Sequence, residues 1–182
     1  MNKNKLIWIK EGYHIFGRKG PSGIHIEKLA KKLNKSKSSF YHYFGDIESF
    51  QEALLDFHLE RAEQIAHMGK DCKNMDPDVI NLLVKTKDDL LFNKQLRLNF
   101  QIPLFKSCFE KSFEKITNSY LDKWNIDIGF EEKPMLGKVI LHILVDNFFL
   151  QVNDENLTYK WFHEYLKNLR SVIQQIQIAY HK

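Results

Sequence analysis

Cysteine, proline and glycine are scarce in this chain, and the scarcity excludes whole classes of protein. Its 182 residues include two cysteines, four prolines and eight glycines. Cys72 and Cys108 are too few for a disulfide framework, and their spacing is neither that of a zinc site nor that of a redox motif. We therefore expect reduced thiols, with a redox switch between the two as the alternative.

Long apolar runs are missing as well. The longest apolar stretch, residues 139–152, is broken by His142, Asp146, Asn147 and Gln151. It therefore falls short of the ~18 apolar residues that a membrane-spanning helix needs. The N-terminus has lysines but not the apolar core and cleavage site of a signal peptide. We expect a cytoplasmic protein.

Catalytic motifs are equally absent from the sequence. It has no His-x-x-x-His pair around a glutamate, no glycine-rich phosphate loop and no serine elbow. Asp88 and Asp89 are adjacent, so on a helix they point apart, as on a solvated face. His58 and His67 are nine residues apart, which does not place both around one metal ion. We expect no enzyme activity, no cofactor and no metal site.

Strand-like alternation is absent too, and helical spacing runs along almost the whole chain, which predicts an all-α fold. The predicted helices cover residues 6–16, 26–33, 37–44, 46–68, 77–92, 94–101, 104–124, 135–151 and 158–180.

Residues 24–50, IHIEKLAKKLNKSKSSFYHYFGDIESF, have the plan of a helix-turn-helix. The first helix has an apolar stripe at helical spacing, formed by Ile26, Leu29, Ala30 and Leu33. Asn34 tolerates the left-handed conformation that ends a helix. Ser36 and Asp46 are suited to cap the two helices that follow.

The second helix of this motif has two different faces. Phe40, Tyr43 and Phe44 can pack inward. The outward set consists of Lys37, Ser38, Ser39, Tyr41 and His42. A lysine can reach a phosphate or a guanine edge, short serines allow close approach to the groove, and the two rings can donate to phosphates. The alternative is a pair of amphipathic helices in an ordinary bundle.

The distribution of charge favours a nucleic-acid partner. Residues 1–45 contain ten basic and two acidic residues, a net charge of +8, whereas residues 46–182 contain seventeen and twenty-one, a net charge of −4. A basic front end joined to a mildly acidic body is typical of a DNA-binding module with a second domain. A solvated lysine face is the alternative.

On these residues the chain resembles the N-terminal domain of TetR/AcrR-type bacterial transcriptional repressors. The matching segments are LIWIKEGYHIFGRKG, LAKKL and SKSSFYHYFGDIESF, within residues 6 to about 54. The resemblance implies a three-helix helix-turn-helix DNA-binding domain at residues 1–46 and a helical effector-binding and dimerisation domain at residues 47–182. The chain departs from the family at Ile47, where the family usually has a lysine that touches the phosphate backbone.

The resemblance also implies which residues contact double-stranded DNA at a palindromic operator. These are Lys3, Lys5, His25, Lys35, Ser36, Lys37, Ser38, Ser39, Tyr41 and His42. Lys3 and Lys5 would reach phosphates from an N-terminal arm. The phosphate contact that Ile47 lacks would be either missing or supplied by Lys35.

The last two predicted helices carry more apolar side chains than one core face needs, which often marks an interface. The candidates are Val139, Ile143, Phe148, Trp161, Tyr165, Leu169, Val172 and Ile176. The resemblance implies a homodimer in which two such helix pairs pack as four helices. Packing of these helices within their own chain is the alternative.

The resemblance further implies a pocket for a small apolar or amphipathic effector in the aromatic-rich body. The candidates are Phe92, Asn99, Phe100, Phe105, Cys108, Phe109, Tyr120, Trp124, His142, Asp146 and Asn147. Aromatic residues at helical spacing also fit an ordinary core. Asp146 and Asn147 also fit an interhelical hydrogen bond, to Tyr120 or Arg97.

The sequence therefore predicts a TetR-like, DNA-binding transcriptional repressor that a small effector releases from its operator. The alternative is a helix-turn-helix protein whose body docks a protein partner instead of a small ligand.

Overall fold

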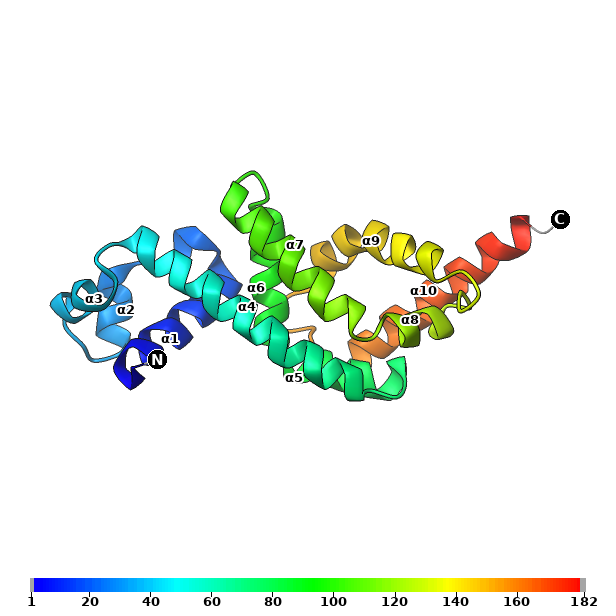
Figure 1. Cartoon of the computed structure of the whole chain (residues 1–182), viewed down its shortest axis with the longest axis horizontal. Coiled ribbons are helices and arrows are strands. Elements are labelled where there is room, and N and C mark those ends of the chain that lie inside the picture. Colours follow the sequence, from blue (N-terminus) through cyan, green and yellow to red (C-terminus); the bar gives the residue numbers. More distant parts are fainter. Residues whose placement is uncertain (1, 181–182) are drawn as a thin grey trace. The chain divides into compact units, whose positions relative to one another are not determined.

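The chain is all-helical, as predicted. The computed structural model describes residues 2–180, and this range contains ten α-helices and two short helical turns but no β-strand. Figure 1 shows their order, from the N-terminus in blue to the C-terminus in red. The α-helices are α1 (Lys3–Lys19), α2 (Ile26–Lys32), α3 (Lys37–Phe44), α4 (Ile47–Asp71), α5 (Ile80–Lys85), α6 (Lys87–Leu98), α7 (Pro103–Asn118), α8 (Leu121–Asp127), α9 (Pro134–Gln151) and α10 (Tyr159–Tyr180). The short turns are η1 (Pro21–Gly23) and η2 (Met75–Val79). Within the described range, no helix combines the length and the apolar character needed to cross a membrane.

The chain divides into two compact units. Unit 1 consists of Met1–Gln64 and Asp88–Glu114, and unit 2 consists of Ile65–Lys87 and Lys115–Lys182. The division falls inside α4 and α7, so each of these helices contributes residues to both units. The predicted DNA-binding domain, residues 1–46, belongs wholly to unit 1.

Helix α1 is longer than predicted at both ends. The Asn2 side chain caps it, because Asn2 Oδ1 accepts a hydrogen bond from the Asn4 N–H at 2.9 Å. Gly20 follows its last turn with a φ of 68°, a conformation that glycine adopts readily. The expected N-terminal arm with Lys3 and Lys5 is therefore wrong, since both residues lie in the first turn of α1.

The first three helices enclose an aromatic core. Trp8 and Phe40 are fully buried, with their rings edge to face at 5.5 Å between centroids. The ring centroid of Phe50, in α4, lies 5.1 Å from that of Phe40. A Cβ atom added to Gly12 would lie 2.4 Å from the Phe50 ring, so only glycine fits there. Figure 1 shows α1, α2 and α3 together, which confirms the three-helix helix-turn-helix.

The helix predicted over residues 77–92 is wrong. It is interrupted at Thr86, whose hydroxyl donates to the Leu82 carbonyl at 2.8 Å and whose backbone leaves the helical region. The chain before this break forms η2 and α5, and the chain after it forms α6. Helix α6 also includes most of residues 94–101, which had been predicted as a separate short helix.

The single helix predicted over residues 104–124 is wrong as well, since α7 and α8 are separate. At the break, the Ser119 hydroxyl and the Ser119 backbone N–H both donate to the Ile116 carbonyl, at 2.6 and 3.1 Å. Gly69, predicted to begin a linker, lies inside α4, where an added Cβ atom would meet Ser119 Oγ at 2.1 Å. Helix α4 thus extends beyond the predicted end at Met68.

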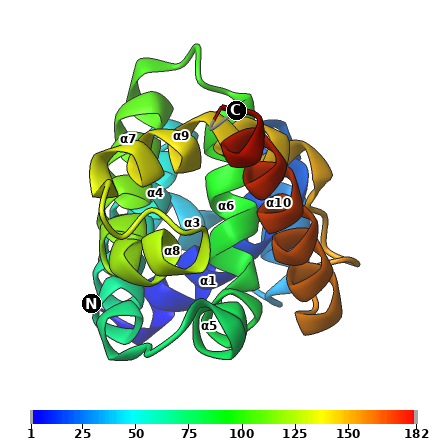
Figure 2. The same ribbon diagram turned by 90° about the vertical axis from the view of Figure 1, so that its right-hand side faces the viewer.

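In unit 2, α8 lies beside α9 (Figure 2). The Trp124 indole N–H donates to the Gly137 carbonyl at 2.9 Å, and a Cβ atom at Gly137 would lie 1.8 Å from Asn125 Oδ1. Arg170 of α10 donates to Asp127 at 3.1 Å. The close approach of the two helices therefore depends on a glycine in the first turns of α9.

Candidate nucleic-acid interface

Helix α3 begins at Lys37, directly after Ser36, the residue predicted to cap it. Ser36 Oγ accepts from the Ser39 N–H at 3.2 Å, and the Ser36 carbonyl accepts from the same N–H at 3.1 Å, so Ser36 caps the first turn of α3. In the preceding turn, Asn34 has the predicted left-handed conformation, with a φ of 52°. The Lys35 N–H donates to the Ala30 carbonyl at 2.9 Å. These bonds fix the turn between α2 and α3.

The two faces of α3 differ strongly in exposure. Phe40 and Phe44 are buried, whereas Tyr43, predicted to pack inward with them, is only half-buried. Ser39 is half-buried too. The exposed side chains of α3 are Lys37, Ser38, Tyr41 and His42. The helix thus presents ammonium, hydroxyl and imidazole groups together while two phenylalanines anchor it.

An ion pair joins α3 to α2. Lys37 Nζ lies 2.6 Å from Glu27 Oε1, and both side chains are exposed. The hydrogen bond and, after it, the charge of Lys37 lower the pKa of the Glu27 carboxyl, and the same two effects of Glu27 raise the pKa of Lys37. Glu27 is not among the predicted DNA contacts. The pair spans ten positions and two helices, so no local pattern in the sequence reveals it.

The other predicted DNA contacts lie in the same unit. Lys5 Nζ is 5.3 Å from the centroid of the Phe44 ring, which brings the first turn of α1 next to α3. Lys3 is exposed at the start of α1, and His25 is exposed immediately before α2. Lys35 is half-buried in the turn between α2 and α3.

Comparison with protein families identifies this arrangement. The model of the tetR family of bacterial regulatory proteins matches residues 9–54, which cover most of α1, all of α2 and α3, and the start of α4. Residues 9–54 therefore form a DNA-binding module of the tetR family. The match supports a DNA-binding transcriptional regulator, and α3 with its exposed face lies within the matched residues. No curated protein matches the chain.

Six of the residues predicted to line an effector pocket lie in unit 1 of the regulator. They are Phe92, Asn99, Phe100, Phe105, Cys108 and Phe109. Phe92 is fully buried, with its ring stacked on Tyr13 and on Phe16 at 4.3 Å each. Phe105 meets Phe16 edge to face at 5.5 Å. Phe92 and Phe105 are therefore brought together around Phe16.

The polar members of this group already have partners. The Asn99 side chain donates to the Gln95 carbonyl in its own helix at 2.9 Å. The Cys108 thiol donates to the Leu55 carbonyl at 3.8 Å, and burial raises the pKa of Cys108 to about 12. Phe100 is half-buried and edge to face with buried Phe109.

The other five effector candidates lie in unit 2. They are Tyr120, Trp124, His142, Asp146 and Asn147. Tyr120 and Trp124 are buried, and the three residues of α9 are exposed. Asn147 Oδ1 accepts from the Gln151 side chain at 2.7 Å and, more weakly, from the Tyr165 hydroxyl at 3.5 Å. Asn147 thus has an interhelical hydrogen bond, but its partner is Tyr165 of α10 and not the predicted Tyr120 or Arg97.

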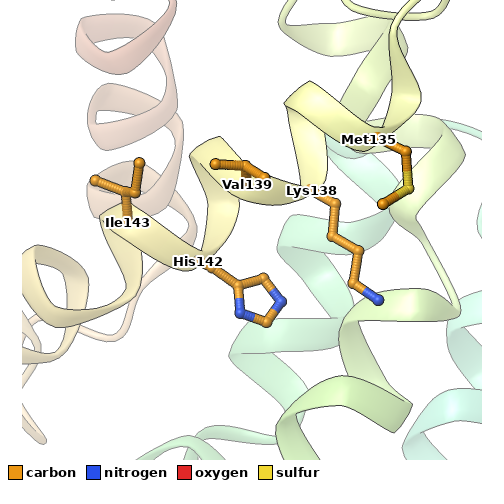
Figure 3. A pocket seen from close by; sticks show the side chains of 5 residues that line it. All are labelled: Met135, Lys138, Val139, His142 and Ile143. Carbon is orange, nitrogen blue, oxygen red and sulfur yellow. The ribbon is translucent and has the colours of Figure 1, made fainter.

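One face of α9 is hollowed. An open depression of about 450 Å³ is lined by Met135, Lys138, Val139, His142 and Ile143. Figure 3 shows these side chains on successive turns of α9, with Lys138 and His142 pointing to the same side. Met135 and Ile143 are 73% and 71% exposed, so this face is unusually apolar for a surface in water.

The residues predicted for dimerisation fall into two groups. Val139, Ile143, Val172 and Ile176 are exposed, whereas Phe148, Trp161, Tyr165 and Leu169 are half-buried. The rings of the second group pack within the chain. For example, the rings of Trp161 and Tyr165 on α10 are stacked, with 5.2 Å between their centroids. The first group leaves apolar area of α9 and α10 open to a partner.

A buried polar cluster in unit 1, here called the Tyr13 cluster, is absent from the predictions. The Tyr13 hydroxyl lies 2.6 Å from His58 Nδ1 and donates to Asp89 at 2.8 Å. Arg61 donates twice to the same carboxylate, at 3.1 and 2.8 Å. His58 Nε2 lies 3.1 Å from Asn93 Oδ1. The cluster links α1, α4 and α6.

The assignment of Asp89 to a solvated face is therefore wrong, because this residue is 3% exposed and paired with Arg61. The sequence did contain a signal. Asp89 precedes Phe92 by three residues and Leu96 by seven, so it shares their buried stripe on α6. A carboxylate on such a stripe needs a partner.

Proposed function

We propose that the regulator is a homodimeric repressor that binds a palindromic operator through α3 and is released by a small apolar or amphipathic effector in the cytoplasm. The observation that carries the DNA-binding part is the two-faced α3. Phe40 and Phe44 are buried and anchor the helix, and the exposed side chains of Lys37, Ser38 and Tyr41 can approach the major groove.

The exposed apolar residues of α9 and α10 support the homodimer. Val139, Ile143, Val172 and Ile176 are each about half or more exposed, which is costly in water and favourable at an interface. A two-fold dimer would present two copies of α3 to two half-sites, which accounts for a palindromic operator.

Helix α4 supports the proposed release by an effector. It begins at the Asp46 cap, directly after α3, where Asp46 Oδ1 accepts from the Ser49 N–H at 2.7 Å. It continues into unit 2. A ligand that binds more tightly to one position of α4 than to another would change the spacing of the two α3 helices and the affinity for the operator. The effector residues predicted in each unit stay the candidates for a ligand site within that unit.

The alternative, a body that docks a protein partner, is favoured by one observation. The hollow of α9 is lined by strongly exposed apolar side chains, Met135 and Ile143 among them. If the purified protein were a monomer in solution, this face would remain uncovered and the protein-docking function would replace the homodimer.

Binding of the full-length protein to mixed-sequence duplex DNA, measured by fluorescence anisotropy at several salt concentrations, tests the DNA-binding proposal. We expect binding that weakens steeply with salt. Lys37→Ala and Tyr41→Ala should each weaken it by about tenfold, because each removes a donor to the duplex. Lys70→Ala, the same charge change at an exposed position in unit 2, is the matched control and should have little effect. Absence of wild-type binding at low salt would reject the proposal.

A further inference from the structure

The basic front segment contains an acidic residue whose position needs an explanation. Residues 1–45 have ten basic residues and two acidic ones, Glu11 and Glu27. Glu11 pairs with Lys32 at 2.6 Å, and its side chain is 20% exposed. Glu27 is different, because its side chain is 77% exposed on α2 and its partner is a residue of α3. A carboxylate at this place would repel the phosphates of a duplex.

Protein stability does not account for Glu27. Its ion pair with Lys37 is short, at 2.6 Å, but both side chains are exposed. Exposed ion pairs contribute little to stability, because water and salt screen them and the long side chains lose freedom. The pair therefore calls for a reason that lies outside the free protein.

The pair is held in a fixed relation to the DNA-binding face. Lys37 is the first residue of α3, directly after the Ser36 cap, and Glu27 is the second residue of α2. The hydrogen bond from the Lys35 N–H to the Ala30 carbonyl fixes the turn between the two helices. The ammonium and the carboxylate are thus presented side by side before DNA arrives, which reduces the ordering cost of a contact.

We propose that Glu27 and Lys37 together read one guanine–cytosine base pair in the major groove, an inference that rests on the proposed DNA-binding function. An ammonium donates to guanine O6 and N7, and a carboxylate accepts from the cytosine N4 amine. Guanine O6 and cytosine N4 are hydrogen-bonded to each other in the base pair, about 2.9 Å apart. The ammonium and carboxylate of the protein, 2.6 Å apart, match this spacing.

The guanine–cytosine pair fits better than adenine–thymine. Guanine offers two neighbouring acceptors to the ammonium, and the adjoining base then offers a donor to the carboxylate. In adenine–thymine the donor lies between the two acceptors, and the thymine methyl group lies beside O4. The charged pair therefore faces a matching row of groups at guanine–cytosine and an interrupted row at adenine–thymine.

Selection of binding sites from a randomised duplex pool tests this proposal. The full-length wild type is compared with Glu27→Ala, Lys37→Ala and the control Glu60→Ala, which removes an exposed carboxylate from α4. We expect a guanine–cytosine preference at one position of each half-site. Glu27→Ala and Lys37→Ala should both relax it, by about tenfold, at that same position. Glu60→Ala should leave every preference unchanged.

The remaining outcomes distinguish failure of DNA binding from failure of the base reading by Glu27 and Lys37. Failure of the wild type to enrich any duplex would reject the DNA-binding function itself, and the base reading with it. Enrichment by the wild type with unchanged preferences in Glu27→Ala would reject the base reading alone. The same holds if Glu27→Ala binds every sequence more tightly without losing a preference, if the two variants relax different positions, or if the shared position prefers adenine–thymine.

Discussion

Lowering the pH from 6.5 to 4 should reduce the free energy of unfolding of the regulator. The contribution of His58 to this fall should be about 3 kcal/mol. His58 is fully buried in the Tyr13 cluster. Burial, opposed in part by the charge of Asp89, lowers the pKa of His58 from 6.5 to about 4. The folded protein therefore holds this imidazole neutral at a pH where the unfolded chain protonates it.

The sign of the effect follows from proton binding. Between pH 6.5 and pH 4 the unfolded state binds a proton at His58 that the folded state does not, so acid favours unfolding. The stabilisation is complete above pH 6.5 and is lost as the pH falls through this window. Each pKa unit corresponds to about 1.4 kcal/mol, and the difference of about 2.5 between the two pKa values gives about 3 kcal/mol.

Urea unfolding followed by circular dichroism, at pH values from 7.5 to 4, measures this dependence. The comparison is between the wild type and His58→Gln, which removes the titrating group and should show a shallower fall in unfolding free energy with acid. His67→Gln removes an exposed histidine from the same helix and serves as the control. Other titrating groups contribute equally to all three proteins, so the difference between the curves isolates His58.

A difference of the opposite sign would refute the reasoning. The two ring nitrogens of His58 lie near Tyr13 Oη and Asn93 Oδ1. An imidazolium could donate to both. If the wild type gained stability over His58→Gln between pH 6.5 and 4, these partners and Asp89 would outweigh burial, and His58 would be charged in the folded state.

Three further predictions concern packing, capping and assembly. Gly137→Ala should destabilise the protein by about 1–3 kcal/mol and lower its melting temperature, because the new Cβ would lie 1.8 Å from Asn125 Oδ1; an unchanged melting temperature would contradict this packing. Ser36→Ala should cost about 1 kcal/mol in urea unfolding through loss of the α3 cap, whereas Ser38→Ala, an exposed neighbour, should stay within about 0.5 kcal/mol. Ile143→Glu should shift the protein from dimer to monomer in sedimentation velocity, since it places a charge on the proposed interface; a dimer that persists would place the interface elsewhere.

The caps of the helix-turn-helix could be predicted from the sequence because their chemistry is local. Ser36 and Asp46 each accept from an N–H three residues later, and Asn34 takes the left-handed conformation that few other residues tolerate. Each of these features depends on residue type and on neighbours within one turn. The position of α3 followed from them, whereas the prediction of its two faces failed at Ser39 and Tyr43, which are both half-buried.

The breaks in the body could not be predicted in the same way. Neither Thr86 nor Ser119 is a strong helix breaker, and each ends a helix in a place where its hydroxyl donates to a carbonyl of the preceding turn. Gly69 is the reverse case, because it was predicted to begin a linker but lies inside α4, where Ser119 leaves no room for a Cβ atom. The contact of Gly69 with Ser119 joins segments distant in the sequence, and helical periodicity reports neither this contact nor the two hydroxyl hydrogen bonds.

The same limit applies to the charged residues. Lys37 was predicted from its place on α3, but its partner Glu27 belongs to another helix. Asp89 was assigned to the surface because Asp88 stands beside it, yet Arg61, 28 positions away, pairs with the buried carboxylate and offsets the cost of its desolvation. Pairing across helices decides the role of each of these residues.

The most direct test of the central claim, that α3 reads the major groove as part of a dimer, is methylation interference at guanine N7 on a selected duplex. The account predicts two groups of interfering guanines on the duplex, separated by one helical turn or a whole number of turns. Lys37→Ala should weaken the interference at both groups together. Guanines that do not interfere at all, or that interfere equally with and without the Lys37 side chain, would contradict it.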